Sequence, residues 1–391
     1  MIIARLTSIN LTLWLAVVLF HSCNTDQGGE HGFNLVDPNA TPETKALYRN
    51  LKSLSGHHIL FGHQDALAYG VGRRDNKNSF SDVKDITGAF PAIYGWDIGH
   101  ISCKSNIDSI PFPMMIELIK QGYERGGVIT ISWHELHPKP GKELWSQEPS
   151  PAKVLPGGVL HDEFRNKLLL VGDFFDQLRD NNGNPIPVIF RPWHEHNGDW
   201  FWWGTHNSSE QEFIDLWRYT VHFLRDTLHI HHLLYAFSPD RSRMASVHDH
   251  MDFLYAYPGD DYVDILGFDN YWDVGLLDFA SSGIAREIQD SLFILSLRTL
   301  VETAEQRNKI AALTETGLDM LHEHDWFTSR ILYPVMNDSV ARRIAYVLVW
   351  RNAWKDHFFA PYPGHPSEKD FIDFYSSPFV LFEHDLPPMY R

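Results

Sequence analysis

Eight short apolar runs recur along the chain, and they constrain its fold more than any other feature of the sequence. A parallel sheet that is buried on both faces needs strands of this near-continuous apolar kind. Amphipathic stretches with helical spacing separate several of the runs, at 113–125, 162–180, 209–228 and 284–307. This alternation predicts an α/β fold, the (β/α)8 TIM barrel. The runs that we expect to be its strands are 58–62, 91–97, 127–133, 186–191, 232–238, 263–269, 309–315 and 345–351.

A doubly wound open sheet is the alternative that the same alternation allows. Dinucleotide binding in such a sheet needs a Gly-x-Gly-x-x-Gly turn after the first strand, and none follows residues 58–62. The length of 391 residues suits one large barrel, which we expect as a single catalytic domain over 41–391. We expect the proline-rich loop 138–158 to form a wall of the cleft and the aromatic tail 357–391 to wrap the barrel.

Polar or aromatic side chains occupy the C-terminal end of every predicted strand. In a barrel these ends converge on one mouth, which is where such enzymes place their chemistry. Chance could place one or two such residues there, but hardly all of them. They are His63-Gln64, Trp96-Asp97, Trp133-His134-Glu135, Trp193-His194-Glu195, Ser238-Pro239-Asp240, Asn270-Tyr271-Trp272, Glu315 and Trp350-Arg351.

Two glutamates stand out among these strand ends. Glu195 follows the fourth run in a stretch that also holds Arg191, two histidines and four tryptophans, and Glu315 ends the seventh run. The fourth and seventh strands of a barrel lie across its mouth, so the two carboxyl groups can face each other. Retaining hydrolysis of a glycoside needs such a pair about 5–5.5 Å apart, one as proton donor and one as nucleophile. We therefore predict that Glu195 is a catalytic acid/base and Glu315 a nucleophile, acting on a sugar.

The surroundings of the two glutamates fit these roles. A proton donor keeps its proton near neutral pH when its walls are apolar. Tyr271 is placed to donate a hydrogen bond to Glu315, and Arg191 adds positive charge that holds the pair. The competing interpretations are structural: Glu195 could be a buried acid paired with Arg191, and Glu315 a helix-start acid satisfied by backbone amides. The residues that could wall Glu195 are Trp193, Trp200 and Trp203.

Composition narrows the class of partner. The formal net charge of −17 argues against nucleic acid and anionic lipid, because both need a basic face. Aromatic residues make up 14% of the chain, with 13 tryptophans, more than a core usually needs. Extra indole rings often serve as stacking platforms for flat apolar ligand faces such as those of sugars, although an aromatic core is the alternative.

The 23 histidines require a test for metal ligands. Residues 134–137 read His-Glu-Leu-His and lack the spacing of the zinc helix His-Glu-x-x-His. A metallohydrolase with ligands drawn from His63, His134, His194 and Asp240 stays open as an alternative. Neutral imidazoles that bond sugar hydroxyls explain His134 and His194 without a metal, so we expect no metal and no other cofactor. A Gly-x-Ser-x-Gly elbow is also missing from the sequence.

The N-terminal sequence predicts export. Arg5 precedes the apolar run 11–20, which is short for a membrane span and typical of a signal peptide. Cys23 follows it in the manner of a lipoprotein signal, so we expect a signal peptide over 1–22, lipidation of Cys23 and a tether over 23–40. The location would be the periplasm or the outer-membrane surface of a Gram-negative glycan-degrading bacterium, with the lipid as the only membrane contact. We expect a monomer without disulfides.

The strand ends resemble those of glycoside hydrolase family 26 over roughly residues 55–351. The resemblance implies a (β/α)8 barrel, a retaining mechanism and, for most members, β-1,4-mannanase activity with no cofactor. The segments Trp193-His194-Glu195 to Trp203 and Thr314-Glu315-Thr316-Gly317 match the two active-site motifs. The other matching segments are 61–64, 95–97, 132–134 and 267–272.

Residue by residue, the resemblance implies roles for the strand-end side chains. Glu195 matches the acid/base, Glu315 the nucleophile, and Tyr271 the tyrosine that bonds the nucleophile. Arg351 matches an arginine at a more distal glycone subsite, and Trp145 in the long loop is a further candidate stacking wall. The complete set that we predict to bind substrate is His134, His194, Trp200, Tyr271, Arg351, Trp96, Trp145 and Arg191.

Mannan, glucomannan or galactomannan is therefore the expected partner, cut at internal bonds. Alternatives of the same chemistry are an exo-acting enzyme that releases mannobiose, a β-1,3-xylanase and a lichenase. A surface lipoprotein that binds glycans without turnover is the alternative from another class. The presence of both glutamates argues against it, because a binding protein has no need of a proton donor opposite a nucleophile.

Overall fold

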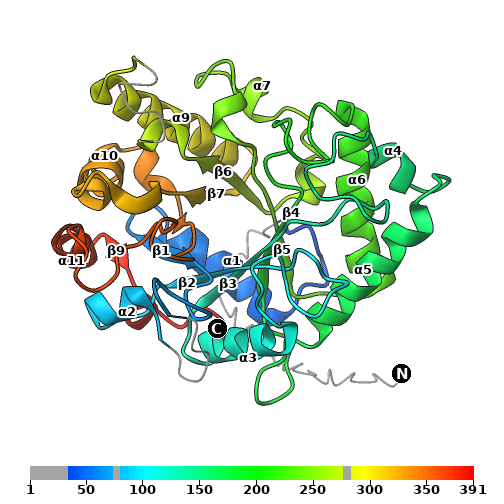
Figure 1. Ribbon diagram of the computed structural model, residues 1–391, viewed down its shortest axis with the longest axis horizontal. Helices are drawn as coiled ribbons and strands as arrows, with labels where there is room; N and C mark the ends of the chain where they lie inside the picture. Colours follow the sequence, from blue (N-terminus) through cyan, green and yellow to red (C-terminus); the bar gives the residue numbers. More distant parts are fainter. Residues whose placement is uncertain (1–33, 74–79, 276–282) are drawn as a thin grey trace, which may run out of the picture. The chain divides into compact units, whose positions relative to one another are not determined.

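The structure, a computed structural model, describes residues 34–73, 80–275 and 283–391. Eight parallel strands close into a barrel in the order β2-β3-β4-β5-β6-β7-β8-β1, and β1 pairs back with β2 (Figure 1). The predicted (β/α)8 barrel is confirmed, and each predicted run overlaps one strand. The strands are β1 (Ile59–Gln64), β2 (Ile93–Asp97), β3 (Val128–Trp133), β4 (Val188–Pro192), β5 (Leu233–Phe237), β6 (Ile265–Asn270), β7 (Ile310–Thr316) and β8 (Tyr346–Val349).

The helices around the barrel are unequal in length. The four predicted amphipathic stretches form α3, α5, α6 and α9, and α6 continues as a π-helical turn over Phe223–Thr227. In the described residues, the connections from β1 to β2 and from β5 to β6 contain the short α-helices α2 and α7. The helices are α1 (Pro42–Leu54), α2 (Asp82–Thr87), α3 (Phe112–Glu124), α4 (Pro151–Val154), α5 (His161–Asp176), α6 (Glu210–His222), α7 (His250–Phe253), α9 (Arg286–Gln306), α10 (Tyr333–Asn337) and α11 (Glu368–Tyr375).

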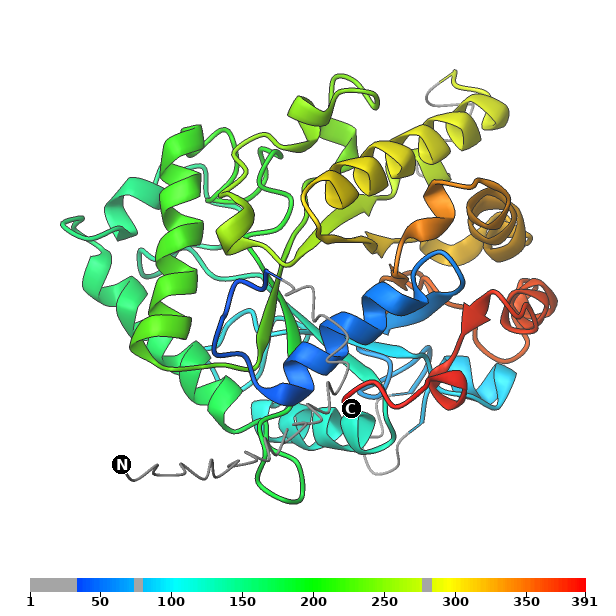
Figure 2. The same ribbon diagram turned by 180° about the vertical axis from the view of Figure 1, so that it is seen from behind.

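Helix α1 closes the N-terminal end of the barrel. Its start follows the sequence signals, because the Thr41 hydroxyl accepts a hydrogen bond from the Thr44 amide at 3.2 Å and Pro42 begins the first turn. Leu47 and Leu51 of this helix belong to the same apolar cluster as the side chains that fill the barrel. In Figure 2 α1 lies in front of the strands. The open mouth is therefore at the C-terminal ends of the strands.

The sequence places residues 34–40 in a tether, but in the structure they pack on the barrel. Val36 is buried and its amide donates to Asp264 at 2.8 Å, while Asp37 pairs with His231. The compact unit therefore begins at Asn34, because these side chains have partners on the barrel. The predicted signal peptide and Cys23 lie outside the described residues. Of the helices in the described ranges, none is long and apolar enough to cross a membrane.

The C-terminal tail wraps the barrel, as the sequence predicts. Phe371 and Phe374 of α11, with Phe382, pack their rings against Phe61 of β1. The tail also adds a ninth strand, β9 (Val380–Leu381), which the sequence analysis did not predict. It pairs with the first residues of β1, where β1 has no hydrogen bonds to β2. A two-residue strand leaves no periodic pattern, so only the tertiary structure reveals it.

Asn352 ties the segment after β8 to the rest of the mouth. Its amide nitrogen donates to Asp82 and to the Ala360 carbonyl, each at 2.9 Å, and its oxygen accepts from the amides of Phe359 and Ala360. Because the side chain is buried, Asn352→Ala should lower the free energy of unfolding by about 2–4 kcal/mol. Urea denaturation checks this value against the exposed control Asn181→Ala, and equal stabilities of the two variants would contradict it.

Candidate active site

A bulge between β6 and β7 places Glu315 at the barrel mouth. Phe268 pairs with Leu313 but Asp269 pairs with Glu315, so Thr314 is an extra residue in β7. The Thr314 hydroxyl accepts from the Phe268 amide and donates to Asp269, each at 2.8 Å. A side chain at Gly267 would meet Thr314 at 2.5 Å, so the bulge needs glycine there. The bulge therefore allows two consecutive side chains, those of Thr314 and Glu315, to make polar contacts at the barrel mouth.

Both carboxylate oxygens of Glu315 have donors. The Tyr271 hydroxyl donates to Oε1 at 2.9 Å, which confirms the hydrogen bond predicted between these side chains. Arg191 donates to Oε2 through Nη2, while its Nη1 donates to Asp269 at 2.6 Å and to Ser238 at 3.1 Å. Glu315 and Arg191 are both buried, so the carboxylate is held in one orientation.

Glu195 lies on a strained turn directly after β4. Trp193 and Glu195 have φ angles of 50° and 52°, in the left-handed region that side chains rarely adopt. The Glu195 amide donates to the Ser238 carbonyl at 2.8 Å, which fixes the turn to the end of β5. The Trp200 indole donates to Oε2 of Glu195 at 2.8 Å, so one carboxylate oxygen is positioned by a side chain of its own loop.

Four carboxyl groups, those of Glu195, Asp240, Asp269 and Glu315, interact electrostatically at this mouth. Burial raises the pKa of Glu195 well above its usual range, and the charges of Asp240, Glu315 and Asp269 raise it further, while Arg191 opposes them. Burial also raises the pKa of Asp269, although Arg191 acts to lower it. Arg191 hydrogen-bonds Glu315 and Asp269 but not Glu195. Burial and the neighbouring acids therefore favour the protonated form of Glu195.

Two histidines and an aspartate form a chain next to the glutamates. Nδ1 of His134 lies 2.7 Å from Asp97, and its Nε2 lies 3.0 Å from Nε2 of His194. Burial acts to raise the pKa of Asp97, but the charge and hydrogen bond of His134, with donors from Ser132 and Gly99, outweigh it and lower the pKa. Burial, with the charge of His134, holds the pKa of His194 well below its usual range. His194 is therefore neutral, and Asp97 orients His134 toward it.

The long loop reaches the mouth through aromatic rings. Trp145 is 54% exposed and stacks on Phe201, with ring centroids 5.1 Å apart and an interplanar angle of 24°. Phe201 lies 5.4 Å from the ring of His134, and the guanidinium of Arg243 lies 5.0 Å over the ring of Trp200. The exposed ring of Trp145 thus stands on the same side of the mouth as Glu195.

Three residues predicted to bind substrate are buried. Trp96 and His194 have no exposed surface and Arg191 is 3% exposed. Trp96 belongs to the apolar layer between strands and helices, because strand residues alternate faces and its position points outward. Its assignment as a sugar contact is therefore wrong. Arg191 and His194 lie behind Glu315 and His134, where they can hold these groups but offer almost no surface to a ligand.

The three tryptophans predicted to wall Glu195 differ in their contacts. Trp193 and Trp203 are fully buried, and their indole groups donate to the Thr220 hydroxyl and the His194 carbonyl. Only Trp200, of the three tryptophans proposed as walls, has a hydrogen bond to Glu195. Trp193 therefore ties the strained turn to α6, and Trp203 bonds the turn at the His194 carbonyl.

The remaining predicted contact, Arg351, lies after β8 and pairs with Asp108 from the loop after β2. Its side chain keeps 19% exposure. The sequence analysis gave no role to Asp97 or Asp269, although each is an acid at a strand end. Their positions at strand ends were the signal that could have identified them. In the structure Asp97 orients His134, and Asp269 shares Arg191 with Glu315.

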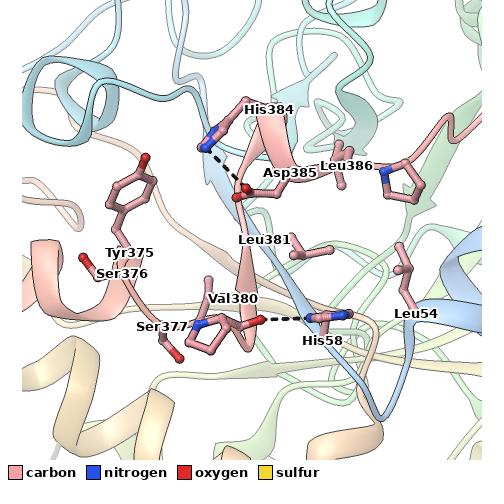
Figure 3. A pocket seen from close by; sticks show the side chains of 12 residues that line it. Leu54, His58, Tyr375, Ser376, Ser377, Val380, Leu381, His384, Asp385 and Leu386 are labelled. Atoms are coloured by element: carbon pink, nitrogen blue, oxygen red, sulfur yellow. Dashed lines mark hydrogen bonds and ion pairs between the residues drawn. The ribbon is translucent and has the colours of Figure 1, made fainter.

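In the described part of the chain, no group of three or more His, Cys, Asp or Glu is arranged to hold a metal ion. A pocket of about 670 Å³ lies at the N-terminal end of β1, bounded by His58, Tyr375, Leu381 and His384 (Figure 3). The carboxyl groups described above lie at the opposite end of the strands, so this pocket is separate from them.

Comparison with known proteins identifies the family. The sequence profile described as glycosyl hydrolase family 26 matches residues 36–316, most of the chain. A mannan endo-1,4-β-mannosidase of Bifidobacterium adolescentis is 34% identical over 293 residues, and one of Bacillus subtilis strain 168 is 30% identical over 258 residues. These matches take in 73% and 62% of this chain, but 28% and 67% of the two relatives. The chain belongs to glycosyl hydrolase family 26.

Solved structures share the barrel over nearly the whole chain. A family 26 β-mannanase from Bacteroides ovatus has a TM-score of 0.81 and 38% identity, covering 90% of this chain and 98% of its own. A modular endo-β-1,4-mannanase from Cellulomonas fimi has a TM-score of 0.82 and 32% identity, covering 91% of this chain and 79% of its own.

Proposed function

We propose that this protein is a retaining β-mannanase that hydrolyses internal β-1,4-mannosidic bonds of mannan, glucomannan or galactomannan. The relatives named as mannan endo-1,4-β-mannosidases support the substrate. The observation that carries the chemistry is the division between the two glutamates. Glu195 has a raised pKa and one indole donor, whereas Glu315 accepts from Arg191 and Tyr271. A retaining glycosidase needs this division between a protonated acid and an oriented carboxylate.

The proposed reaction is a double displacement. The Glu315 carboxylate attacks the anomeric carbon while Glu195 gives its proton to the departing glycosidic oxygen, so the C–O bond to the leaving sugar breaks. Glu195 then takes a proton from water, which attacks the same carbon and releases Glu315. Both proton transfers use one residue, and no cofactor takes part. His134 and Trp200, which border the glutamates and stay partly exposed, are proposed to contact the sugars beside the cleaved bond.

The substrate is tested with a panel of polysaccharides. Incubation with glucomannan, galactomannan, β-1,3-xylan and lichenan, followed by sizing of the products, should give mixed manno-oligosaccharides from the first two alone. Early release of mannobiose without longer products would indicate exo action. Products from xylan or lichenan alone would indicate the other β-glycanases. Binding without products from any polysaccharide would indicate the glycan-binding lipoprotein and contradict the proposal.

Tyr271 provides a finer test of the same site. Tyr271→Phe removes the hydroxyl that donates to Glu315 but keeps the ring, which packs against Phe359 with centroids 5.9 Å apart. We expect kcat on glucomannan to fall by about 10²-fold, because one oriented donor to the reacting carboxylate is lost. Steady-state kinetics checks this, with Tyr333→Phe on the exposed surface of α10 as control. A loss of less than twofold would remove Tyr271 from the proposed mechanism.

A further inference from the structure

Trp354 is an exposed aromatic ring on the segment that follows β8. Its side chain is 47% exposed, and with Trp145 it is one of two tryptophans with large exposure in the described ranges. The backbone around it is fixed, since Trp354 and His357 exchange hydrogen bonds of 3.2 and 3.1 Å across a tight turn. The ring of His357 lies 5.7 Å from that of Trp354. An exposed indole on a fixed backbone offers an apolar face to a ligand.

A chain of aromatic rings links Trp354 to the nucleophile side of the mouth. Tyr271, which donates to Glu315, lies 5.9 Å from Phe359, and Phe359 lies 5.2 Å from His357. His357 in turn borders Trp354. Trp354 therefore lies beyond Glu315, whereas the other exposed tryptophan, Trp145, lies on the side of Glu195.

The positively charged side chain of Arg351 lies beside the Trp354 ring and could donate hydrogen bonds to a sugar stacked on it. The guanidinium of Arg351 lies 6.0 Å from the Trp354 ring, and Asp108 pairs with its Nη1. An apolar ring face beside a positioned donor matches a pyranose, which carries C–H groups on its faces and hydroxyls on its rim. Scattered exposed apolar residues are normal on proteins, but Trp354 combines exposure, a fixed backbone and a neighbouring cation at the barrel mouth.

We propose that Trp354 is the outermost sugar-stacking platform on the glycone side of the cleft. The side follows from the reaction, because the acid/base lies toward the leaving sugar and the nucleophile beneath the glycone sugar. The two exposed tryptophans then mark opposite ends of the bound chain, Trp354 on the glycone side and Trp145 on the aglycone side. This inference rests on the proposed function and adds a length and direction to it.

The test uses manno-oligosaccharides of increasing length. In Trp354→Ala we expect kcat/KM for mannohexaose to fall roughly tenfold, the factor given by about 1.4 kcal/mol of lost stacking, while mannotriose changes less than twofold. Trp354→Phe should recover most of the loss. Tyr333→Ala, which removes an exposed ring from α10, is the matched control and should change neither substrate. An equal loss at both lengths, or no loss at either, would overturn the proposal.

Direction is read from the position of cleavage. With mannopentaose isotopically labelled at its reducing-end oxygen, mass spectrometry separates products from the two ends. Trp354→Ala should shift cleavage toward the non-reducing end, because fewer sugars are then held on the glycone side, and Trp145→Ala should shift it the other way. Shifts in the same direction, or none, would contradict the assignment. If the unaltered protein cleaves no manno-oligosaccharide, the proposed function itself fails, and this inference fails with it.

Discussion

Replacing Glu315 by alanine is expected to reduce hydrolysis of glucomannan by at least about 10⁴-fold, because the covalent intermediate cannot form. The loss should appear in kcat, since Glu315 reacts with the sugar rather than merely binding it. It would be measured by reducing-sugar release under substrate saturation. Turnover within tenfold of the unaltered protein would remove Glu315 from the role of nucleophile.

The fold should survive this change. Asp269 still accepts from Nη1 of Arg191 after Glu315 is lost, so the guanidinium keeps a buried hydrogen-bond partner. Circular dichroism should show an unaltered spectrum. Glu315→Gln, which keeps the shape of the side chain, should lose activity to a similar degree. Glu117→Ala, on the exposed side of α3, is the matched control and should retain full activity.

Replacing Glu195 is expected to have the second largest effect, and the effect should depend on the leaving group. Glu195→Ala should lower kcat/KM on glucomannan by about 10³-fold, the usual contribution of a general acid. Dinitrophenolate is a stable anion that leaves a dinitrophenyl β-mannobioside without taking up a proton, so formation of the glycosyl-enzyme from this substrate should be far less affected. Pre-steady-state release of dinitrophenol measures this step. Equal losses on both substrates would indicate that Glu195 is not the proton donor.

The pH profile gives an independent reading of Glu195. Because burial and neighbouring acids raise the pKa of Glu195, the residue keeps its proton well above the range of an ordinary glutamate. The first step needs that proton, so kcat/KM should hold through neutral pH and fall as the pH rises through this raised pKa. Glu195→Gln does not titrate, so its residual activity should lack this alkaline limb. A limb of unchanged position in Glu195→Gln would assign it to another group.

The barrel was predictable because each strand is buried on both faces and so reads as an apolar run. The contact between Tyr271 and Glu315 was also predictable, since neighbouring strands β6 and β7 bring their ends together. The orientation of single side chains was not. Trp96 stands at a strand end like Tyr271, yet it faces the outer layer. The position of a residue along a strand is visible in the sequence. Whether its side chain faces the barrel interior or the outer layer depends on the strand register, and a bulge such as that at Thr314 changes this register.

The partner of Arg191 shows a second limit of sequence reasoning. Arg191 and Glu195 are near neighbours in the chain, and the sequence predicts that the guanidinium holds both glutamates of the pair, with a salt bridge to Glu195 as the structural alternative. In the structure the guanidinium bonds Glu315 and Asp269, which are distant in sequence. The strained turn at Trp193 and Glu195 directs the Glu195 side chain to Trp200 instead. Backbone strain of this kind is held by tertiary contacts and leaves no local signal.

The most direct test of the central claim is the anomeric configuration of the first product. A retaining reaction through Glu315 and Glu195 inverts the anomeric carbon twice, so the new reducing end must form as the β-anomer. Proton NMR of mannopentaose hydrolysis, recorded before mutarotation, resolves the two anomers. Initial accumulation of the β-anomer is the predicted result. Initial accumulation of the α-anomer would contradict the account.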